Sequence, residues 1–274
     1  MFKKKEKYEH DLYREIRDLP QRKDKKKQII SYWKTYKDYA PKKFLNNLQH
    51  EQYFKHRWWE MFLGVGLINL GFEILTSESD KGPDFRVNTF NGDINIEAVA
   101  PKQGKEPNRL PNLKMGVHDL KPKREKFLLR LSNALKNKKD KFNKYIEEKV
   151  VDNKSFNIIA ISTCSLSQYG SLMDISCPSI LSVLKDVGNP IINLDTGKCS
   201  YAKKSSIKKS NGSKVSSDLF DQEEYAYISA VLFSNIDILN SQDRPEESFV
   251  LVVNNNAKNK LSKKIIEKFN CDIY

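Results

Sequence analysis

The chain has 274 residues, enough for one large domain or two small ones, and its 14 Phe, 12 Tyr and 3 Trp can fill a core, so global disorder is excluded. No run of 18 apolar residues occurs, and no apolar stretch follows the basic N-terminus. We therefore expect no membrane span and no secretory signal, and we predict a cytoplasmic protein. The 48 Lys and Arg against 35 Asp and Glu give a net charge of +13.

The positive charge is concentrated in two segments. Residues 1–50 carry 15 basic and 7 acidic side chains, and residues 101–150 carry 15 and 6, whereas residues 51–100 carry 4 and 8. Basic segments of this kind favour a polyanionic partner, because they neutralise phosphates and release counterions. Solvated lysine-rich helix faces would produce the same composition, so charge alone leaves both interpretations open.

The first part of the chain is predicted to be helical, over residues 5–18, 22–39 and 43–71. On the second helix, Tyr32, Trp33, Tyr36 and Tyr39 alternate with lysines. We interpret these aromatic rings as packing the N-terminal helices onto the core, with stacking on bases as the alternative. The end of the third helix is apolar almost all round and should be buried, with its glycines allowing close helix packing.

Strands dominate from residue 72 onward. We predict strands at Phe72–Thr76, Pro83–Phe90, Asp93–Ala100, 156–163, 227–234 and 249–255. We predict helices at 122–148, 178–186 and 260–269, and a mobile excursion at 195–218. Strands and helices in this order predict an α/β core with a mixed sheet.

The hairpin around Asn91-Gly92 carries the sharpest chemical signal. With those two residues as the turn, period-2 alternation places Asp84 and Glu97 on one face, as diagonal neighbours about 7 Å apart. The opposite face, which includes Phe85 and Ile96, is apolar and should lie in the core. Two carboxylates at this spacing can share a hard divalent cation such as Mg²⁺. The same register places Arg86 opposite Glu97, so a simple cross-strand ion pair is the alternative.

Zinc chemistry is not favoured. The four cysteines form no CxxC pair, and the four histidines form no HExxH or HxH cluster. Reduced thiols in a reducing compartment are the simpler interpretation.

The segments Lys81-Gly82-Pro83-Asp84-Phe85 and Asn95-Ile96-Glu97-Ala98-Val99 resemble the PD-(D/E)xK nuclease superfamily. The resemblance covers roughly residues 52–163 and includes the order helix, strand, hairpin, helix, strand. It implies a restriction-endonuclease-like α/β fold with a mixed central sheet flanked by helices. Residues 1–50 would then be a basic helical N-terminal extension, and 51–274 the nuclease-like domain, with its C-terminal strands and helix in 164–274.

The resemblance also implies roles for individual residues. Asp84 and Glu97 would ligate Mg²⁺, which Mn²⁺ could replace, and Glu60 would be the additional carboxylate from the preceding helix. The family's lysine, two residues after the Glu, is absent, because that position is Val99.

A displaced lysine is predicted from helix periodicity. In residues 122–148, Lys138 interrupts an apolar stripe that includes Leu131 and Tyr145, so it should face the two carboxylates or snorkel to solvent. Arg130 and Lys141 flank this stripe. Lys102, five residues after Glu97, is the weaker catalytic candidate. We predict that Lys102, Arg130 and Lys141 contact nucleic acid.

Three functions remain open. The first is a Mg²⁺-dependent endonuclease that hydrolyses phosphodiester bonds, of DNA rather than RNA. The second is an inactive protein of the same fold that binds nucleic acid. The third is an interaction protein whose charges keep it dissolved. A homodimer is compatible with all three, and we expect no membrane partner.

Overall fold

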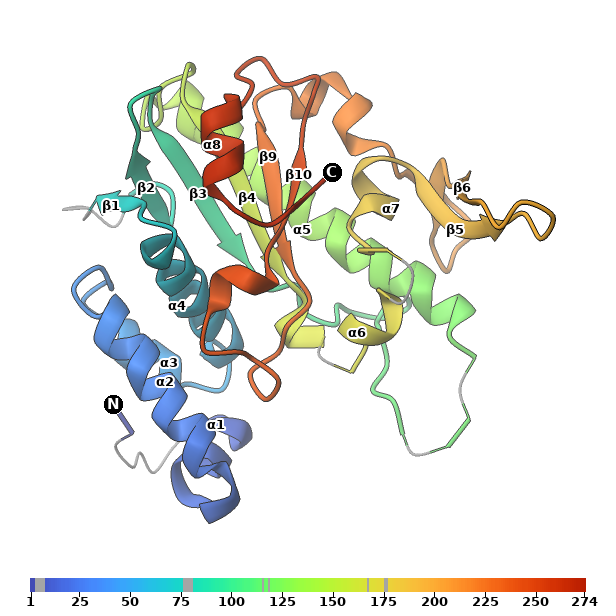
Figure 1. Cartoon of the computed structure of the whole chain (residues 1–274). Helices are drawn as coiled ribbons and strands as arrows, with labels where there is room; N and C mark the ends of the chain where they lie inside the picture. The colour runs from blue at the N-terminus through green and yellow to red at the C-terminus, as the bar shows by residue number, and fades with distance from the viewer. Residues whose placement is uncertain (3–7, 76–80, 115, 118, 167, 175–176) are drawn as a thin grey trace.

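The computed structural model describes residues 1–2, 8–75, 81–114, 116–117, 119–166, 168–174 and 177–274. Its centre is a mixed seven-stranded sheet in the order β1-β2-β3-β4-β9-β10-β11 (Figure 1). The strands span Glu73–Leu75, Phe85–Asn88, Ile94–Val99, Phe156–Ser162, Ala230–Ser234, Val250–Val253 and Asp272–Ile273. Strand β3 pairs with β2 in antiparallel and with β4 in parallel orientation. The predicted α/β class with a mixed sheet is confirmed.

Helix α4 packs on one face of the sheet, and the N-terminal helices pack against α4 (Figure 1). The helices are α1 (Asp11–Asp18), α2 (Lys23–Tyr36), α3 (Phe44–Gln49) and α4 (Phe54–Asn69). Tyr32 and Tyr36 are buried in one core with α4 and the sheet, whereas Tyr39 is exposed. Gly64 permits this packing, because a Cβ there would lie 2.5 Å from the Tyr36 ring. The expected role of the α4 glycines in close packing is therefore confirmed.

The helix predicted over 43–71 is interrupted between α3 and α4, and the predicted single helix is wrong. His50 is extended and forms a bridge with Glu9, while the Glu51 N–H donates to the Tyr8 carbonyl. These bonds to a distant segment compete with the helical bonds of residues 50–53. They also keep residues 8–10 outside the first predicted helix, so that α1 begins later than predicted, at Asp11; residues 3–7 lie outside the described part.

Helix α5 (Lys121–Glu147) crosses the other face of the sheet (Figure 1). Its apolar stripe, with Phe127, Leu131, Leu135 and Phe142, forms a second core with the sheet residues that point to this side. Helices α6 (Gly170–Met173) and α7 (Leu181–Leu184) adjoin this core. Both faces of the sheet are therefore covered, and polar side chains on the α5 face are buried.

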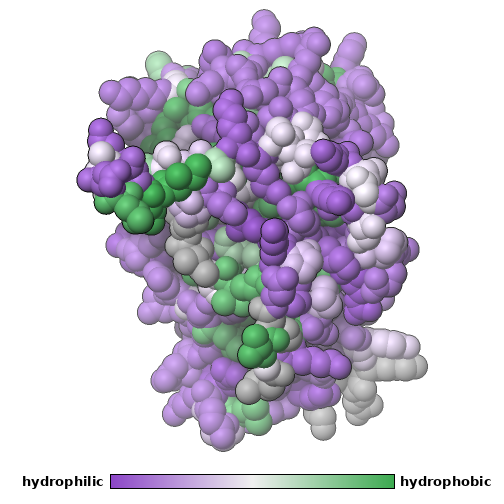
Figure 2. Space-filling model, turned by 90° about the vertical axis from the view of Figure 1, so that its right-hand side faces the viewer, coloured by the Kyte–Doolittle hydropathy of each residue, from purple (hydrophilic) through white to green (hydrophobic). Residues whose placement is uncertain are grey.

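The segment between α7 and β9 is more regular than the sequence predicts. Two small hairpins occupy it, β5–β6 (Val187–Ile192, Cys199–Lys203) and β7–β8 (Ser206–Lys208, Lys214–Ser216). The helix predicted at 178–186 shrinks to α7, because the chain turns into β5. Helix α8 (Lys263–Lys268) precedes β11, an edge strand that we did not predict. Figure 2 shows that the face carrying these hairpins is mostly hydrophilic, with small separate hydrophobic patches.

Within the described residues, no helix is both long and apolar enough to cross a membrane.

Candidate functional site

The β2–β3 hairpin has a different register from the predicted one. Phe85 pairs with Ile96 and Arg86 with Asn95, and the Gly92 N–H donates to the Thr89 carbonyl. The turn therefore contains four residues, Thr89–Gly92, and the pairing is displaced by two positions. A displacement of two preserves the faces of both strands, whereas a displacement of one would have exchanged them. For this reason, the prediction of which side chains share a face of the hairpin is still correct.

Asp84 and Glu97 lie together on the α5 side of the sheet. Asp84 directly precedes β2, and its Oδ2 accepts the Ala98 N–H at 2.8 Å. Glu97 is central in β3 with a side chain that is 0% exposed, whereas the Asp84 side chain is 20% exposed. Phe85 and Ile96 are buried in the opposite core. The predicted placement of these four residues is confirmed.

Lys138 joins the two carboxylates. Its Nζ lies 2.5 Å from Glu97 Oε2 and 3.5 Å from Asp84 Oδ2, and its side chain is 14% exposed. The predicted position near the pair is confirmed, and the alternative of a snorkelling lysine is wrong. Lys141, one turn further along α5, places its Nζ 2.8 Å from Glu97 Oε1, with 41% of its side chain exposed.

The alternative Arg86–Glu97 ion pair is not formed, because Arg86 Nη2 donates to the Val150 carbonyl at 2.8 Å. Tyr145 also contacts Glu97: its hydroxyl lies 3.0 Å from Glu97 Oε1 and 2.5 Å from the Gly82 carbonyl oxygen, and its single proton can be donated to either acceptor. The buried carboxylate therefore has two ammonium groups and one hydroxyl around it. Such a group needs these partners, since an unpaired buried charge is strongly unfavourable.

The pKa values of the two carboxyl groups move in opposite directions. Burial, and after it the neighbouring Asp84 charge, raise the pKa of Glu97 against the opposing effect of Lys138. Burial would also raise the pKa of Asp84, but Lys138, His56 and Lys141 together lower it below the usual range. Asp84 is thus the more readily ionised member of the pair.

Glu60 lies near this cluster on α4, at 1% exposure. Its carboxylate accepts a hydrogen bond from the Tyr36 hydroxyl at 3.3 Å and is paired with Arg57. Burial, followed by the Asp84 charge, raises the pKa of Glu60 to about 7. No direct contact joins Glu60 to Asp84 or Glu97 within the described residues.

This pKa makes the stability of the protein depend on pH. The pKa of Glu60 is raised from 4.5 to about 7, so the folded state holds a proton that the unfolded chain releases in this window. The resulting stabilisation is complete below pH about 4.5 and is lost as the pH rises through about 7. We expect Glu60→Gln to become more stable relative to wild type as the pH rises, by up to about 1.4 kcal/mol per unit within the window.

Urea unfolding at several pH values measures this difference. Glu73→Gln is a matched control, because Glu73 is exposed on edge strand β1. A free-energy difference between Glu60→Gln and wild type that stayed constant from pH 5 to pH 8 would contradict the prediction.

Lys102 and Arg130 do not contact Asp84 or Glu97. They line a cavity of about 380 Å³ next to the carboxylate site. Lys138 lines the same cavity, whereas Lys141 does not. The structure thus separates the predicted nucleic-acid contacts into two places: Lys141 at Glu97, and Lys102 with Arg130 in the cavity.

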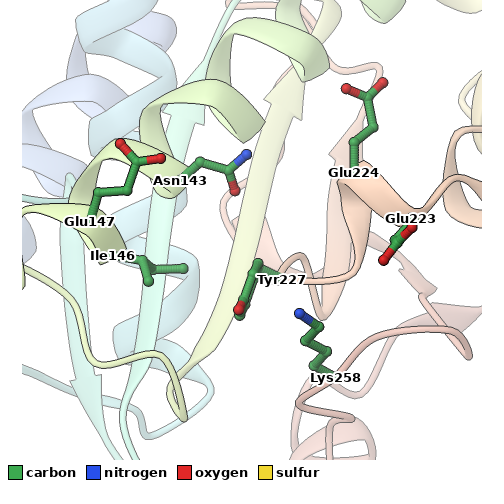
Figure 3. A pocket seen from close by; sticks show the side chains of 7 residues that line it. All are labelled: Asn143, Ile146, Glu147, Glu223, Glu224, Tyr227 and Lys258. Carbon is green, nitrogen blue, oxygen red and sulfur yellow. The ribbon is translucent and has the colours of Figure 1, made fainter.

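A larger cavity of about 560 Å³ lies at the C-terminal end of α5 (Figure 3). It is lined by Asn143, Ile146, Glu147, Glu223, Glu224, Tyr227 and Lys258. Three of these side chains are acidic and one is basic, so the lining favours a phosphate less than that of the smaller cavity, which has no acidic side chain.

The site offers few donor atoms for the predicted metal. Within the described part of the chain, no group of three or more His, Cys, Asp and Glu side chains is arranged to hold a metal ion. Mg²⁺, however, commonly takes one or two carboxylates and completes its shell with water and phosphate oxygens. Asp84 uses Oδ2 for its contacts with the Ala98 N–H and with Lys138 among the described residues. Asp84 and Glu97 therefore fit a Mg²⁺ ion, provided that an ammonium group withdraws from Glu97.

Two members of the cluster were not predicted as site residues. Tyr145 lies seven residues after Lys138 on the same helix face, and its hydroxyl required a polar partner in the core. His56 lies four residues before Glu60, and burial lowers its pKa to about 4. Helical spacing from the predicted residues could have identified both.

No protein-family model, curated protein or solved structure matches this chain.

Proposed function

We propose that the protein is a Mg²⁺-dependent nuclease that hydrolyses phosphodiester bonds of nucleic acid, DNA rather than RNA, with a restriction-endonuclease-like fold. The observation that carries this proposal is the Lys138 ammonium group, which lies 2.5 Å from Glu97 and 3.5 Å from Asp84. Two carboxylates and a lysine in contact are the residue types that the resemblance requires. Here the lysine comes from α5 instead of from the strand position that Val99 occupies.

The topology supports the proposal. The order α4, β1, the β2–β3 hairpin, α5 and β4 is the order on which the resemblance rests. Strand β4 lies beside β3 in parallel orientation, which brings α5 over the polar side of the hairpin. This crossover is what places Lys138 against the carboxylates.

Each side chain has a defined task in this proposal. Asp84 and Glu97 would hold Mg²⁺, which would act as a Lewis acid toward a phosphodiester oxygen. Lys138 contributes a fixed positive charge where negative charge develops on the phosphate. Tyr145 orients Glu97 through its hydrogen bond. Lys141, with 41% of its side chain exposed, can turn from Glu97 toward a phosphate.

Cleavage assays test the proposal by metal removal. Labelled DNA and RNA, single- and double-stranded, are incubated with the protein in Mg²⁺, in Mn²⁺ and in excess EDTA. We expect cleavage of DNA in either metal and none in EDTA, because the carboxylates alone do not activate the phosphodiester. Absence of cleavage of every substrate in both metals would overturn the proposal.

One observation favours a second function, binding without cleavage. Lys138 and Lys141 occupy both oxygens of Glu97, and Val99 replaces the usual lysine, so the site could be permanently closed by its own ion pairs. An inactive binder would still lose affinity for duplex DNA steeply as the salt concentration rises. The slope of log affinity against log salt concentration steepens by about 0.9 for each phosphate that is neutralised. Fluorescence anisotropy between low and physiological salt distinguishes this binder from an interaction protein, for which we expect no such slope.

A further inference from the structure

The 380 Å³ cavity beside the carboxylates has an organised lining. Arg130, Asn133, Asn137 and Lys138 come from one stripe of α5, at spacings of three, four and one residues. The segment after β3 forms the other wall with Val99–Lys102 and Gly104. Lys138 therefore borders both the cavity and the carboxylate site, so the two are adjacent.

Four polar side chains that line the cavity have no partner among the described residues, whereas Lys138, which also borders it, is paired with Glu97 and Asp84. The side chains of Arg130, Lys102, Asn133 and Asn137 form no hydrogen bond or ion pair with those residues, and Arg130 Nε is buried without an acceptor. No acidic side chain belongs to the lining. Burial lowers the pKa of Arg130, and no carboxylate is close enough to offset this effect. A half-buried, unpaired guanidinium group is unfavourable for folding, so an external anion would stabilise it.

Gly104 holds Arg130 in this position. A Cβ at Gly104 would lie 1.8 Å from Arg130 Nη1 and 2.6 Å from its Cζ. The backbone at Gly104 has φ of +84°, a conformation that favours glycine. The loop therefore packs directly against the guanidinium group and leaves no room for another side chain. Arg130 is confined to the cavity wall and cannot easily reach a carboxylate elsewhere.

We propose that this cavity is a phosphate-binding subsite, in which Arg130 and Lys102 bind one phosphate group of a nucleic-acid strand while another phosphodiester of the same strand lies at Asp84 and Glu97. The Asn133 and Asn137 amides supply additional donors, and Lys138 borders both phosphates. Arg130 and Lys138 are eight residues apart, about 12 Å along the helix axis, so a strand lying along α5 reaches both. This inference rests on the proposed function only for the source of the phosphate; the anion site itself needs no metal and no cleavage.

The first experiment measures inorganic phosphate binding to the full chain by calorimetry and thermal shift, in EDTA and at constant ionic strength. We expect Arg130→Met and Lys102→Met each to weaken phosphate binding at least about tenfold, as loss of a hydrogen bond to a charged group predicts. Lys136→Met is the matched control, because Lys136 is exposed on α5 outside the cavity, and it should bind like wild type. Without phosphate, Arg130→Met should melt no lower than wild type, because it removes an unpaired charge.

The second experiment identifies the source of the phosphate. DNA oligonucleotides with a 5′-phosphate, a 3′-phosphate or hydroxyl ends are bound to wild type and Arg130→Met. If Arg130→Met weakens binding only of oligonucleotides with a terminal phosphate, the cavity binds strand ends. If it weakens binding of all oligonucleotides equally, the cavity binds backbone phosphates. Either result supports the subsite.

Unchanged phosphate affinity in both Arg130→Met and Lys102→Met would overturn the subsite, even if the protein cleaves DNA. Conversely, loss of phosphate binding in these variants of a protein that cleaves nothing would support the subsite and reject the nuclease. The two proposals can therefore fail separately.

Discussion

Replacing Lys138 with Met should lower cleavage at least about tenfold, equivalent to about 1.4 kcal/mol of transition-state stabilisation. The Lys138 side chain is 14% exposed and its ammonium group touches both carboxylates, so it is a charge held in place before substrate arrives. A charge held in this way assists most where negative charge develops during the reaction. Methionine keeps much of the apolar stem and removes the charge, and Glu97 retains Lys141 and Tyr145 as partners, so the fold should persist.

Initial cleavage rates at saturating Mg²⁺, together with melting curves, measure this effect. Lys136→Met serves as the control, because it removes a lysine from the exposed side of the same helix. Lys141→Met should have a smaller effect than Lys138→Met, because Lys141 is 41% exposed and, unlike Lys138, forms no ion pair with Asp84. A Lys138→Met protein that folds and cleaves within about twofold of wild type would remove Lys138 from the mechanism.

Glu97→Ala should abolish cleavage and also destabilise the fold by about 3 kcal/mol, near the lower end of the range for breaking a buried ion pair. On a polar sheet face open to solvent, the loss of a carboxylate would cost little stability. Here α5 covers this face, and the Glu97 side chain is 0% exposed. Its removal leaves Lys138, Lys141 and the Tyr145 hydroxyl without their shared acceptor. The partial exposure of Lys141 limits the loss, since its ammonium group can turn into solvent.

Urea unfolding and metal titration separate the two effects. Glu97→Gln keeps the volume and an oxygen that accepts from Tyr145, so it should unfold at a higher urea concentration than Glu97→Ala while remaining inactive. Asp84→Asn should also be inactive but lose less stability than Glu97→Ala, because the Asp84 side chain is 20% exposed. If Glu97→Gln bound Mg²⁺ and cleaved as wild type does, Glu97 would be a structural residue only.

Local rules were sufficient for several features of the site. Period-2 alternation assigned Asp84 and Glu97 to one face, and helical periodicity selected Lys138 from the lysines of α5. Both rules depend only on neighbouring residues along the chain. They hold regardless of how the hairpin turns, which is why the two-position change of register left the assignment intact.

Other features were decided by contacts between distant segments. The four-residue hairpin turn lies where Asn91 donates to Ser262, 171 residues away, and the break before α4 lies where His50 pairs with Glu9. The isolated segments favour a two-residue turn and an unbroken helix, respectively. Tertiary hydrogen bonds reverse these preferences, because each local preference is weak compared with several satisfied backbone groups.

The sequence by itself determined the class of fold and which polar residues face α5, because side-chain direction follows from the repeat of each strand and helix. Only the tertiary structure decided that Glu97 is buried, that Lys138 and Lys141 share it, and that Arg130 is left unpaired against Gly104. Burial and charge pairing depend on which segments the crossover from β3 through α5 to β4 brings together. Sequence spacing does not specify those distances, so the electrostatics of the site emerge only when both faces of the sheet are covered.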